Sequence, residues 1–382
     1  MDIRKLLEEM ARQEASDLYL TVDSPPVLRV EGEVRPLPLP RLTPPDVEAL
    51  ANSIMTERQK AAFEEKLEMN LAISSETLGR FRVNIFRQRG CVGVVIRRIR
   101  AKIPTLDELG LPPVLKAIAM SRRGLVLVTG ATGSGKSTTQ AAMIAYRSQN
   151  EAGHIVTIED PIEFVHPHAR SIVTQREVGF DTFSFHEALK NALRQAPDVI
   201  LIGEVRDVET MEAAISFAET GHLCIATLHS NNANQAIERI MNFFPHARHQ
   251  EIYLQLSLNL RAIISQRLVP GIDGNRVAAL EILVDTPRIK DLIKRGEVDL
   301  LKEAMEQSTP EGNQTFDQAL FDLYAAGKIT AETALAHADS ANNLRIRIQN
   351  LDMKRAPKSP KTSDPGPFRI QGRDPHAKLR DW

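Results

Sequence analysis

The feature that most restricts how this chain can fold is an eight-residue run near its middle. Residues 130–137 read GATGSGKS, directly after the apolar run LVLVT and directly before TTQAAMIAY, whose pattern favours a helix. Strand, glycine-rich loop and helix in this order, with lysine and serine closing the loop, form the P-loop pattern that cradles phosphates. The sequence therefore predicts an α/β domain in which a buried strand delivers a nucleotide-binding loop.

The residue types of this loop suit ATP. The glycines allow backbone N–H groups to converge on the phosphates, and the following helix presents its positive N-terminal end. Lys136 is expected to neutralise the β- and γ-phosphates, and the Ser137 hydroxyl to hold Mg²⁺. The residues expected to bind ATP are Gly130, Ala131, Thr132, Gly133, Ser134, Gly135, Lys136, Ser137 and Thr138.

Four short apolar runs around this motif set the fold class. GLVLVTG, HIVTIED, DVILIGEV and HLCIATLH are continuous rather than alternating, which is typical of parallel strands buried on both faces. Helical segments separate them, so residues 114–350 are predicted to form one α/β domain. Its last part, from about 234 to 347, is expected to be helical and interrupted only by VAALEILV.

Residues 1–100 have a different texture and are predicted to form a smaller α+β domain. Apolar residues recur at helical spacing over 2–12, and a second helix is expected over 44–67. Short runs of alternating polarity follow each helix. A hairpin turn is expected at Gly90.

Two stretches fall outside these domains. Residues 101–113 contain three prolines and are predicted to be a linker. Residues 351–382 are rich in Pro, Lys and Arg and are predicted to be a disordered tail. This tail is either a solubilising extension or a contact with a partner or a membrane surface.

Charge and cysteine content restrict the setting in which the chain works. Lys plus Arg (48) nearly balances Asp plus Glu (49) and aromatic residues make up 5% of the chain, so no nucleic-acid partner is expected. Cys91 and Cys224 lie in apolar runs, as buried thiols do in a reducing compartment. The N-terminus lacks the pattern of a signal peptide and no run is long enough to span a bilayer, so the expected location is cytoplasmic.

Acidic residues follow two of the predicted strands. Glu204 comes directly after VILIG and is the expected base for the attacking water, whereas Gly203 stands where many P-loop enzymes have an aspartate for Mg²⁺. Glu159 and Glu163 follow HIVTI and are expected to supply the missing charge. The alternative is that the acids here cap a helix or lie in a solvated turn. The expected metal ligands are Ser137, Glu159 and Glu204.

Histidines and arginines add two further hypotheses. His222 and His229 bracket LCIATL, and they are either ordinary polar ends of a strand or groups that sense the γ-phosphate. Arginines are dense between residues 80 and 100. They form either a solvated basic face or an arginine finger that stabilises charge on the γ-phosphate of a neighbouring subunit.

Four motifs in series resemble one family. GATGSGKSTT, TIEDPIEFVH, LRQAPDVILIGEVRD and TGHLCIATLH resemble the Walker A, Asp box, Walker B and His box of secretion and type IV pilus ATPases. Within that group, residues 3–341 are similar to the PilT/PilU family of twitching-motility ATPases. The similarity leans to the PilU branch, because residues 288–295 read RIKDLIKR where the PilT branch carries AIRNLIRE.

The resemblance implies a RecA-like ATPase domain behind a PAS-like N-terminal domain, in a homo-hexamer with ATP at the seam between subunits. It implies that Glu204 is the catalytic glutamate. Glu159 and Glu163 correspond to the Asp box, and His222 and His229 to the His box. Arg82 and Arg97 are chosen as the arginine fingers.

The resemblance also implies a motor at the inner-membrane base of the pilus machinery. Such a motor would support pilus retraction as an accessory to a PilT-like ATPase, act on an inner-membrane platform protein, and reach the membrane only through partners. Three alternatives stay open: an independent retraction ATPase, a catalytically idle ring scaffold and, least favoured, a DNA translocase.

Overall fold

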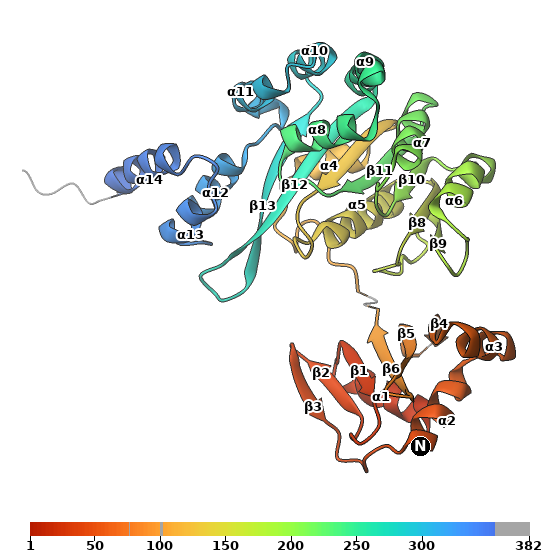
Figure 1. Cartoon of the computed structure of the whole chain (residues 1–382). Helices are drawn as coiled ribbons and strands as arrows, with labels where there is room; N and C mark the ends of the chain where they lie inside the picture. Colours follow the sequence, from red (N-terminus) through yellow and green to blue (C-terminus); the bar gives the residue numbers. More distant parts are fainter. Residues whose placement is uncertain (76, 100–101, 356–382) are drawn as a thin grey trace, which may run out of the picture.

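One hydrophobic core before residue 100 and three core clusters after it divide the described chain into two domains (Figure 1). The structure is a computed structural model that describes residues 1–75, 77–99 and 102–355. Leu18 and Phe81 are fully buried in the N-terminal core, and Leu127 and Ile225 in the core of the larger domain. Among the described residues, no helix has both the length and the apolar character needed to cross a bilayer.

The N-terminal domain is a six-stranded antiparallel sheet with three helices, in the strand order β3-β2-β1-β6-β5-β4. Its helices are α1 (Ile3–Arg12), α2 (Pro44–Ile54) and α3 (Glu57–Lys66). Its strands are β1 (Asp17–Leu20), β2 (Val27–Val30), β3 (Glu33–Pro36), β4 (Glu68–Ser75), β5 (Gly79–Gln88) and β6 (Cys91–Arg98). The predicted α+β character of this domain is confirmed.

Two local predictions for this domain have different outcomes. The hairpin at Gly90 is confirmed, because Arg89 and Gly90 both have positive φ (48° and 78°) and join β5 to β6, as in a two-residue turn of the mirror-image type. The single helix over 44–67 is wrong. Met55 has an extended backbone and Thr56 starts α3 with a capping box to Gln59, so the helix ends and a new one begins.

The larger domain is built on a seven-stranded sheet in the order β13-β12-β7-β11-β10-β8-β9. Six strands are parallel and β13 is antiparallel to β12. The strands are β7 (Gly124–Thr129), β8 (Gly153–Glu159), β9 (Ser171–Glu177), β10 (Val199–Ile202), β11 (Leu223–Leu228), β12 (Leu260–Pro270) and β13 (Arg276–Val284). The four predicted apolar runs are β7, β8, β10 and β11, which confirms the α/β fold class.

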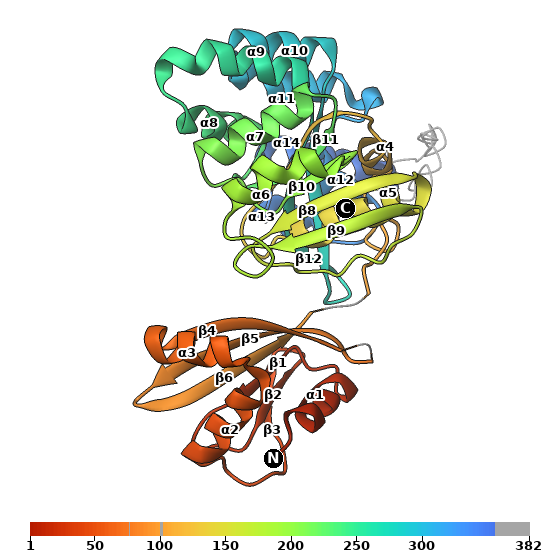
Figure 2. The ribbon, with the colours of Figure 1, turned by 90° about the vertical axis from the view of Figure 1, so that its right-hand side faces the viewer.

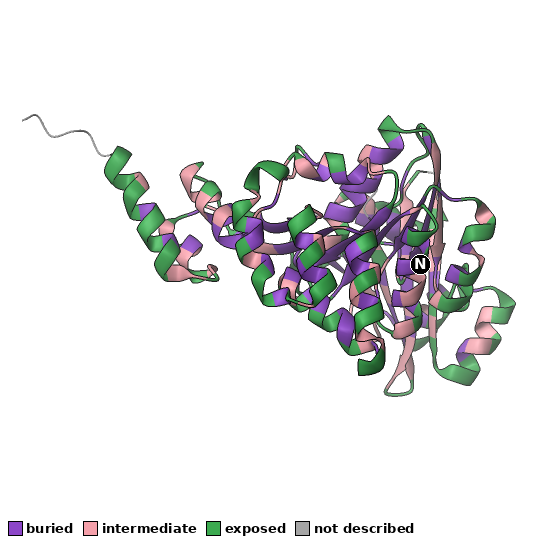
Figure 3. Ribbon diagram, turned by 90° about the horizontal axis from the view of Figure 1, so that it is seen from above, coloured by how far each residue is buried: buried purple, intermediate pink, exposed green. Residues whose placement is uncertain are grey.

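Helices cover both faces of this sheet, so its strands are the most buried part of the molecule (Figures 2 and 3). Leu125 and Leu127 pack toward α6–α11, whereas Val126 and Val128 pack toward α4 and α5. The helices are α4 (Val114–Ala119), α5 (Lys136–Asn150), α6 (Phe185–Ala192), α7 (Val208–Glu219), α8 (Ala233–Phe243), α9 (His249–Asn259), α10 (Pro287–Arg295), α11 (Leu301–Gln307), α12 (Phe316–Ala325), α13 (Ala331–Ala336) and α14 (Ala341–Arg355).

Three boundaries differ from the sequence predictions. The stretch that forms β12 was expected to be helical, because a short continuous apolar run has no period that separates a buried strand from a buried helix. Leu106 and Leu111 are buried in the core beside α4 and α5, so this part of the predicted linker belongs to the larger domain. Helix α14 extends to Arg355, and the rest of the predicted tail lies outside the described residues.

Candidate active site

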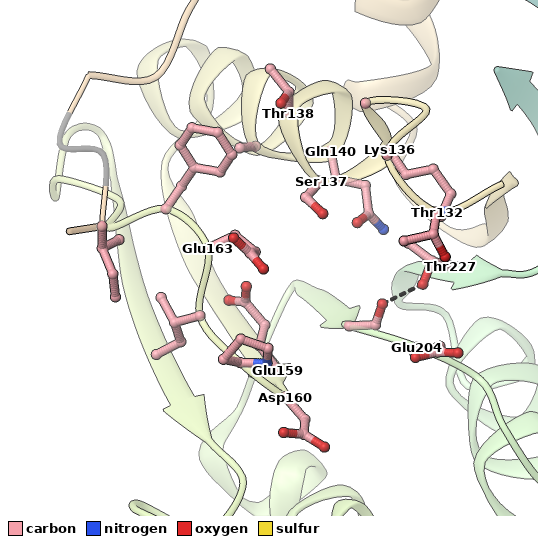
Figure 4. Close-up of a pocket in the computed structure, with 18 of the residues that line it drawn as sticks. Thr132, Lys136, Ser137, Thr138, Gln140, Glu159, Asp160, Glu163, Glu204 and Thr227 are labelled. Carbon is pink, nitrogen blue, oxygen red and sulfur yellow. Dashed lines mark hydrogen bonds between the residues drawn. The ribbon is translucent and has the colours of Figure 1, made fainter. Parts of the chain in front are cut away.

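A cavity of about 660 Å³ lies at the carboxyl ends of β8, β10 and β11, beside the loop that follows β7. In a parallel sheet these ends meet at one edge, where loops place polar side chains around a ligand. Residues of the N-terminal domain, among them Arg82 and Arg97, complete the lining of the cavity. Figure 4 shows the side chains of the P-loop helix facing those that follow β8 and β10.

The backbone of the P-loop explains its glycines. Gly130, Gly133 and Gly135 have φ of 144°, 78° and 90°, which side-chain-bearing residues rarely adopt. A Cβ at Gly130 would lie 2.5 Å from the carbonyl oxygen of Gln266, so β12 supports the loop from behind. Nothing lies within 4 Å of a Cβ built at Gly133. This part of the loop therefore leaves space for a phosphate group beside its backbone amides.

Lys136 is the first residue of α5 and provides the positive charge of the loop. Its Nζ donates to the carbonyl oxygens of Gly130 (2.8 Å) and Ala131 (2.9 Å). Burial lowers the pKa of Lys136, while the nearby Glu204 carboxylate acts in the opposite direction. An anion in the cavity would favour the charged form of this lysine, as expected for a phosphate site.

The remaining predicted loop residues divide between the cavity and its surroundings. Thr132, Gly133, Gly135, Lys136, Ser137 and Thr138 line the main cavity. Ala131 and Gly130 line two smaller pockets, and Ser134 lines one of them. Thr132 and Gly133 line both the main cavity and one of these pockets, so the pockets adjoin the cavity along the loop.

Glu204 follows β10 and is held on the cavity wall by two basic side chains. Its Oε2 accepts a hydrogen bond from Arg206 Nε (2.8 Å) and lies 2.7 Å from Arg206 Nη2. His229, which follows β11, places Nε2 3.0 Å from Glu204 Oε1. Arg206 also reaches Asp160 Oδ2 at 3.4 Å. The sequence analysis missed Arg206, whose only signal was its place two residues beyond Glu204.

Glu159 ends β8, the strand beside β10, and Glu163 follows it; both face the P-loop helix α5 (Figure 4). Glu159 Oε1 accepts hydrogen bonds from Thr157 Oγ1 (2.6 Å) and Gln175 Nε2 (3.2 Å). Burial raises the pKa of Glu159, while these two hydrogen bonds favour its charged form. The two glutamates therefore provide carboxyl oxygens that face the P-loop helix.

The geometry explains why position 203 is a glycine. A Cβ at Gly203 would lie 3.0 Å from the Cα of Glu159, so a side chain here would require the backbone at the end of β8 to move by a few tenths of an ångström. The Gly203 carbonyl oxygen accepts a hydrogen bond from Thr227 Oγ1, which ties β10 to β11. An aspartate here would press against the end of β8, and the acidic groups at this position come from the adjacent strand instead.

The oxygen donors around the cavity fit a hard divalent cation. The Ser137 hydroxyl and the carboxylates of Glu159 and Glu204 are the kinds of ligand that Mg²⁺ prefers. Within residues 1–75, 77–99 and 102–355, no three His, Cys, Asp or Glu side chains converge as a preformed metal site. Phosphate oxygens and water would therefore complete the coordination of the ion.

The predicted arginine fingers lie opposite each other on neighbouring strands, Arg82 on β5 and Arg97 on β6. Arg97 Nε is 2.9 Å from Asp17 Oδ1, and this hydrogen bond raises the pKa of the guanidinium. Arg82 Nε is 3.7 Å from Glu177 Oε1. Both arginines line the cavity beside the P-loop of their own chain, and their expected action on a neighbouring subunit stays a prediction.

His222 is the predicted residue that the structure does not bring to this site. It precedes β11, whereas His229 follows it, and a strand of this length separates its two ends by about 20 Å. His222 Nδ1 is 3.1 Å from Thr220 Oγ1 and 3.3 Å from the carbonyl oxygen of Phe217. Only the second histidine of the predicted pair therefore reaches the cavity.

Two buried side chains in the cavity were missed by the sequence analysis. Gln140 lies three residues after Ser137, hence on the same side of α5, and its Nε2 has no hydrogen-bond partner among the described residues. His166 Nδ1 is likewise without a partner in the described chain, and burial lowers the pKa of His166 to about 4. The helical spacing from Ser137 was the signal that could have identified Gln140.

Known proteins resemble this chain over most of its length. The chain matches the family described as Type II/IV secretion system protein over residues 1–354. It is 56% identical over 350 residues to the type IV pilus ATPase PilU of Pseudomonas aeruginosa, covering 91% of this chain and 92% of that protein. It is 46% identical over 343 residues to the type IV pilus retraction ATPase PilT of the same organism, covering 90% and 100%.

This chain is also similar to a solved structure from the same group of proteins. The crystal structure of the pilus retraction motor PilT with bound ADP matches with a TM-score of 0.85 and 44% sequence identity, covering 91% of this chain and 99% of that one. The resemblance inferred from the four motifs is thereby confirmed. The chain belongs to the family of type II/IV secretion system proteins, and to the group of its ATPases that includes PilU and PilT.

Proposed function

We propose that this chain is a Mg²⁺-dependent motor ATPase of the type IV pilus machinery, which supports pilus retraction and twitching motility as a PilU-like accessory to a PilT-like ATPase. The observation that carries the proposal is one cavity in which the P-loop, Glu204, Glu159 and arginines of the N-terminal domain converge. The 56% identity to PilU supports the choice of machinery.

The residues of the cavity divide the work of ATP hydrolysis. The amides of residues 133–137 and the Lys136 ammonium bind the phosphates. When bound, Mg²⁺ would be held by Ser137 and Glu159 and would neutralise phosphate charge. Glu204 orients the attacking water and accepts its proton, while His229 and Arg206 hold that carboxylate in place.

The N-terminal domain contributes to the same reaction. Arg82 and Arg97 lie on the opposite wall of the cavity, where guanidinium groups stabilise charge that develops on the transferred phosphoryl group. Because these arginines belong to another domain, closure of the cavity and hydrolysis become coupled to domain movement. A homo-hexamer of such chains would convert that movement into work.

The proposed setting is the cytoplasmic face of the inner membrane, at the base of the pilus. There the ring would act on an inner-membrane platform protein and meet the membrane only through its partners. Its substrate is ATP rather than a nucleic acid, since the chain is nearly neutral and has few aromatic residues for stacking on bases.

Complementation in the bacterium that encodes this chain tests the proposal. A strain without this gene should lose twitching, and the wild-type gene should restore it. Glu204→Gln should accumulate to the same level without restoring movement. Light scattering of the purified wild-type protein should give the mass of six chains when nucleotide is present. Full restoration by Glu204→Gln would favour an idle scaffold instead.

A further inference from the structure

Three charged side chains connect the two domains beside the nucleotide cavity. Arg80 and Arg82 lie on β5, and Glu177 is the last residue of β9, on the side of the ATPase domain that faces the N-terminal domain (Figure 2). Arg80 Nη2 donates to Glu177 Oε2 at 3.2 Å. Arg82 Nε lies 3.7 Å from Glu177 Oε1, which is too long for a hydrogen bond. One carboxylate therefore faces two guanidinium groups, and it is hydrogen-bonded to that of Arg80 but not to that of Arg82.

Burial makes this arrangement energetically significant. The Glu177 side chain is 1% exposed, whereas Arg80 and Arg82 are 24% and 34% exposed. Burial raises the pKa of Glu177, and the two arginines oppose that rise. Oε1 has no hydrogen-bond partner among the described residues, so the carboxylate keeps an acceptor site directed at Arg82. A buried carboxylate without a cationic partner would be strongly destabilising.

The two arginines differ in what else they can reach. Residues two apart on a strand project from the same face, which is why β5 presents both to Glu177. Arg82 also lines the nucleotide cavity, together with Lys136 and Glu204. Arg80 is absent from that lining. Arg82 can therefore turn to an anion in the cavity while Arg80 continues to neutralise Glu177.

We infer that Glu177 is a positioning residue that competes with the terminal phosphate of a nucleoside triphosphate for Arg82, while Arg80 keeps the carboxylate paired. The inference rests on the proposed function, since it needs a triphosphate in the cavity. A diphosphate lacks the terminal group and leaves Arg82 with Glu177. The triad then makes the contact between the domains depend on which nucleotide is bound.

This competition has a specific signature in nucleotide affinity. Glu177→Gln keeps the size of the side chain but removes its charge, so Arg82 becomes available to the triphosphate. The ratio of the Kd for ADP to the Kd for a non-hydrolysable ATP analogue should rise about threefold to fivefold, the range of a partly exposed ion pair. Arg80→Gln should lower the same ratio, because Glu177 would then hold Arg82 alone.

Titration calorimetry of the full chain with the two nucleotides measures this ratio. Arg82→Gln should lower the ratio, and adding Glu177→Gln to it should have no further effect. Glu64→Gln is a matched control, because Glu64 pairs with Arg87 on the same strand β5 at 2.8 Å and neither residue lines the cavity. Thermal unfolding of every variant checks that both domains stay folded.

The outcomes separate the inference from the function on which it rests. The competition between Glu177 and phosphate would be overturned if Glu177→Gln changed the Kd values of both nucleotides equally. It would also be overturned if Glu177→Gln raised the ratio of the two Kd values as much in the Arg82→Gln background. A higher ratio in Arg80→Gln would also contradict it. Failure of the unaltered chain to bind either nucleotide would instead refute the proposed function.

Discussion

The two edges of the parallel sheet use similar polar residues in opposite ways. At the carboxyl edge, Glu204 and His229 contact each other at the wall of a cavity. At the amino edge, His154 Nδ1 lies 2.9 Å from the Gln195 carbonyl oxygen, and Asp198 accepts a hydrogen bond from the His154 backbone at 2.8 Å. The difference shows that position along a parallel strand, rather than residue type, separates functional from structural polar groups.

Helix direction strengthens this contrast. Helices α5, α7 and α8 each begin just after the carboxyl end of β7, β10 and β11, so their positive N-terminal ends gather at that edge. The amino edge receives the opposite helix ends. Anionic ligands are therefore favoured at the carboxyl edge alone, and the predictions below test this difference between the edges.

The largest effect is expected for Lys136→Ala. Removal of the ammonium group from the P-loop should lower ATP turnover at least about a thousandfold, since the charge on the β- and γ-phosphates loses its main counter-charge. Lys190→Ala, at an exposed position on α6, is the matched control and should keep full activity. A phosphate-release assay on both variants decides, and turnover retained in Lys136→Ala would contradict the site.

Glu204→Gln should lower kcat about a hundredfold or more and leave the affinity for ATP nearly unchanged, because glutamine has the size of glutamate but cannot accept the proton. Glu219→Gln gives the comparison at the opposite edge. Glu219 ends α7 and accepts a hydrogen bond from Asn259 at 3.3 Å, away from the cavity. Steady-state kinetics of both variants should show the loss only for the first, and equal losses would remove the distinction between the edges.

Glu281 offers a test of stability at the carboxyl edge. It lies on β13 opposite Ser265 of β12, and its carboxylate accepts a hydrogen bond from the backbone of Ala233 at the start of α8 (2.7 Å). Burial raises the pKa of Glu281 to about 7. Asp339 adds to that rise, while Lys302 and Arg267 oppose it.

The raised pKa fixes the sign of a pH effect. The folded chain binds the Glu281 proton more tightly than the unfolded chain, so protonation of Glu281 stabilises the fold. This contribution is complete below the ordinary pKa of a glutamate and is lost as the pH rises through about 7. Glu281→Gln mimics the protonated form. Its stability relative to the unaltered chain should therefore increase by about 2 kcal/mol between pH 5 and pH 8. Urea denaturation across this range measures it, and a constant difference would mean that the carboxyl group does not titrate there.

The smallest effect is expected from the histidine pair that brackets β11. His229→Ala should lower kcat about tenfold, because His229 holds the Glu204 carboxylate at 3.0 Å. His222→Ala should change kcat less than about twofold, because its contacts are with Thr220 and Phe217. Parallel measurements of kcat test the contrast, and a larger loss in His222→Ala would place that residue back in the reaction.

The parts of the site that could be predicted from the sequence are those fixed by short-range pattern. The P-loop is one continuous run in which each glycine has a positive φ angle that other residues rarely adopt. The strands β7, β8, β10 and β11 are unbroken apolar runs. Glu159 and Glu204 could be placed because the first ends a recognisable strand and the second closely follows one. Local chemistry and local geometry agree at these positions, so no distant contact had to be known.

The parts that could not be predicted depend on the order of strands and on distant partners. His222 precedes β11, which runs parallel to β7 as expected, so it lies at the other edge; it entered the predicted site only through the resemblance to the His box. The contact between Arg80 and Glu177 joins residues 97 positions apart. The helix expected where β12 lies shows the same limit, because pairing with β7 decides its conformation.

Binding and hydrolysis of ATP by the purified full-length chain test the central claim most directly. The account predicts that the chain binds ATP, releases phosphate when Mg²⁺ is present, and stops releasing it when a chelator removes the metal. Under the same conditions the Lys136→Ala variant should neither bind ATP nor release phosphate. A folded wild-type chain that shows no heat of binding and no phosphate release at millimolar MgATP would contradict the account.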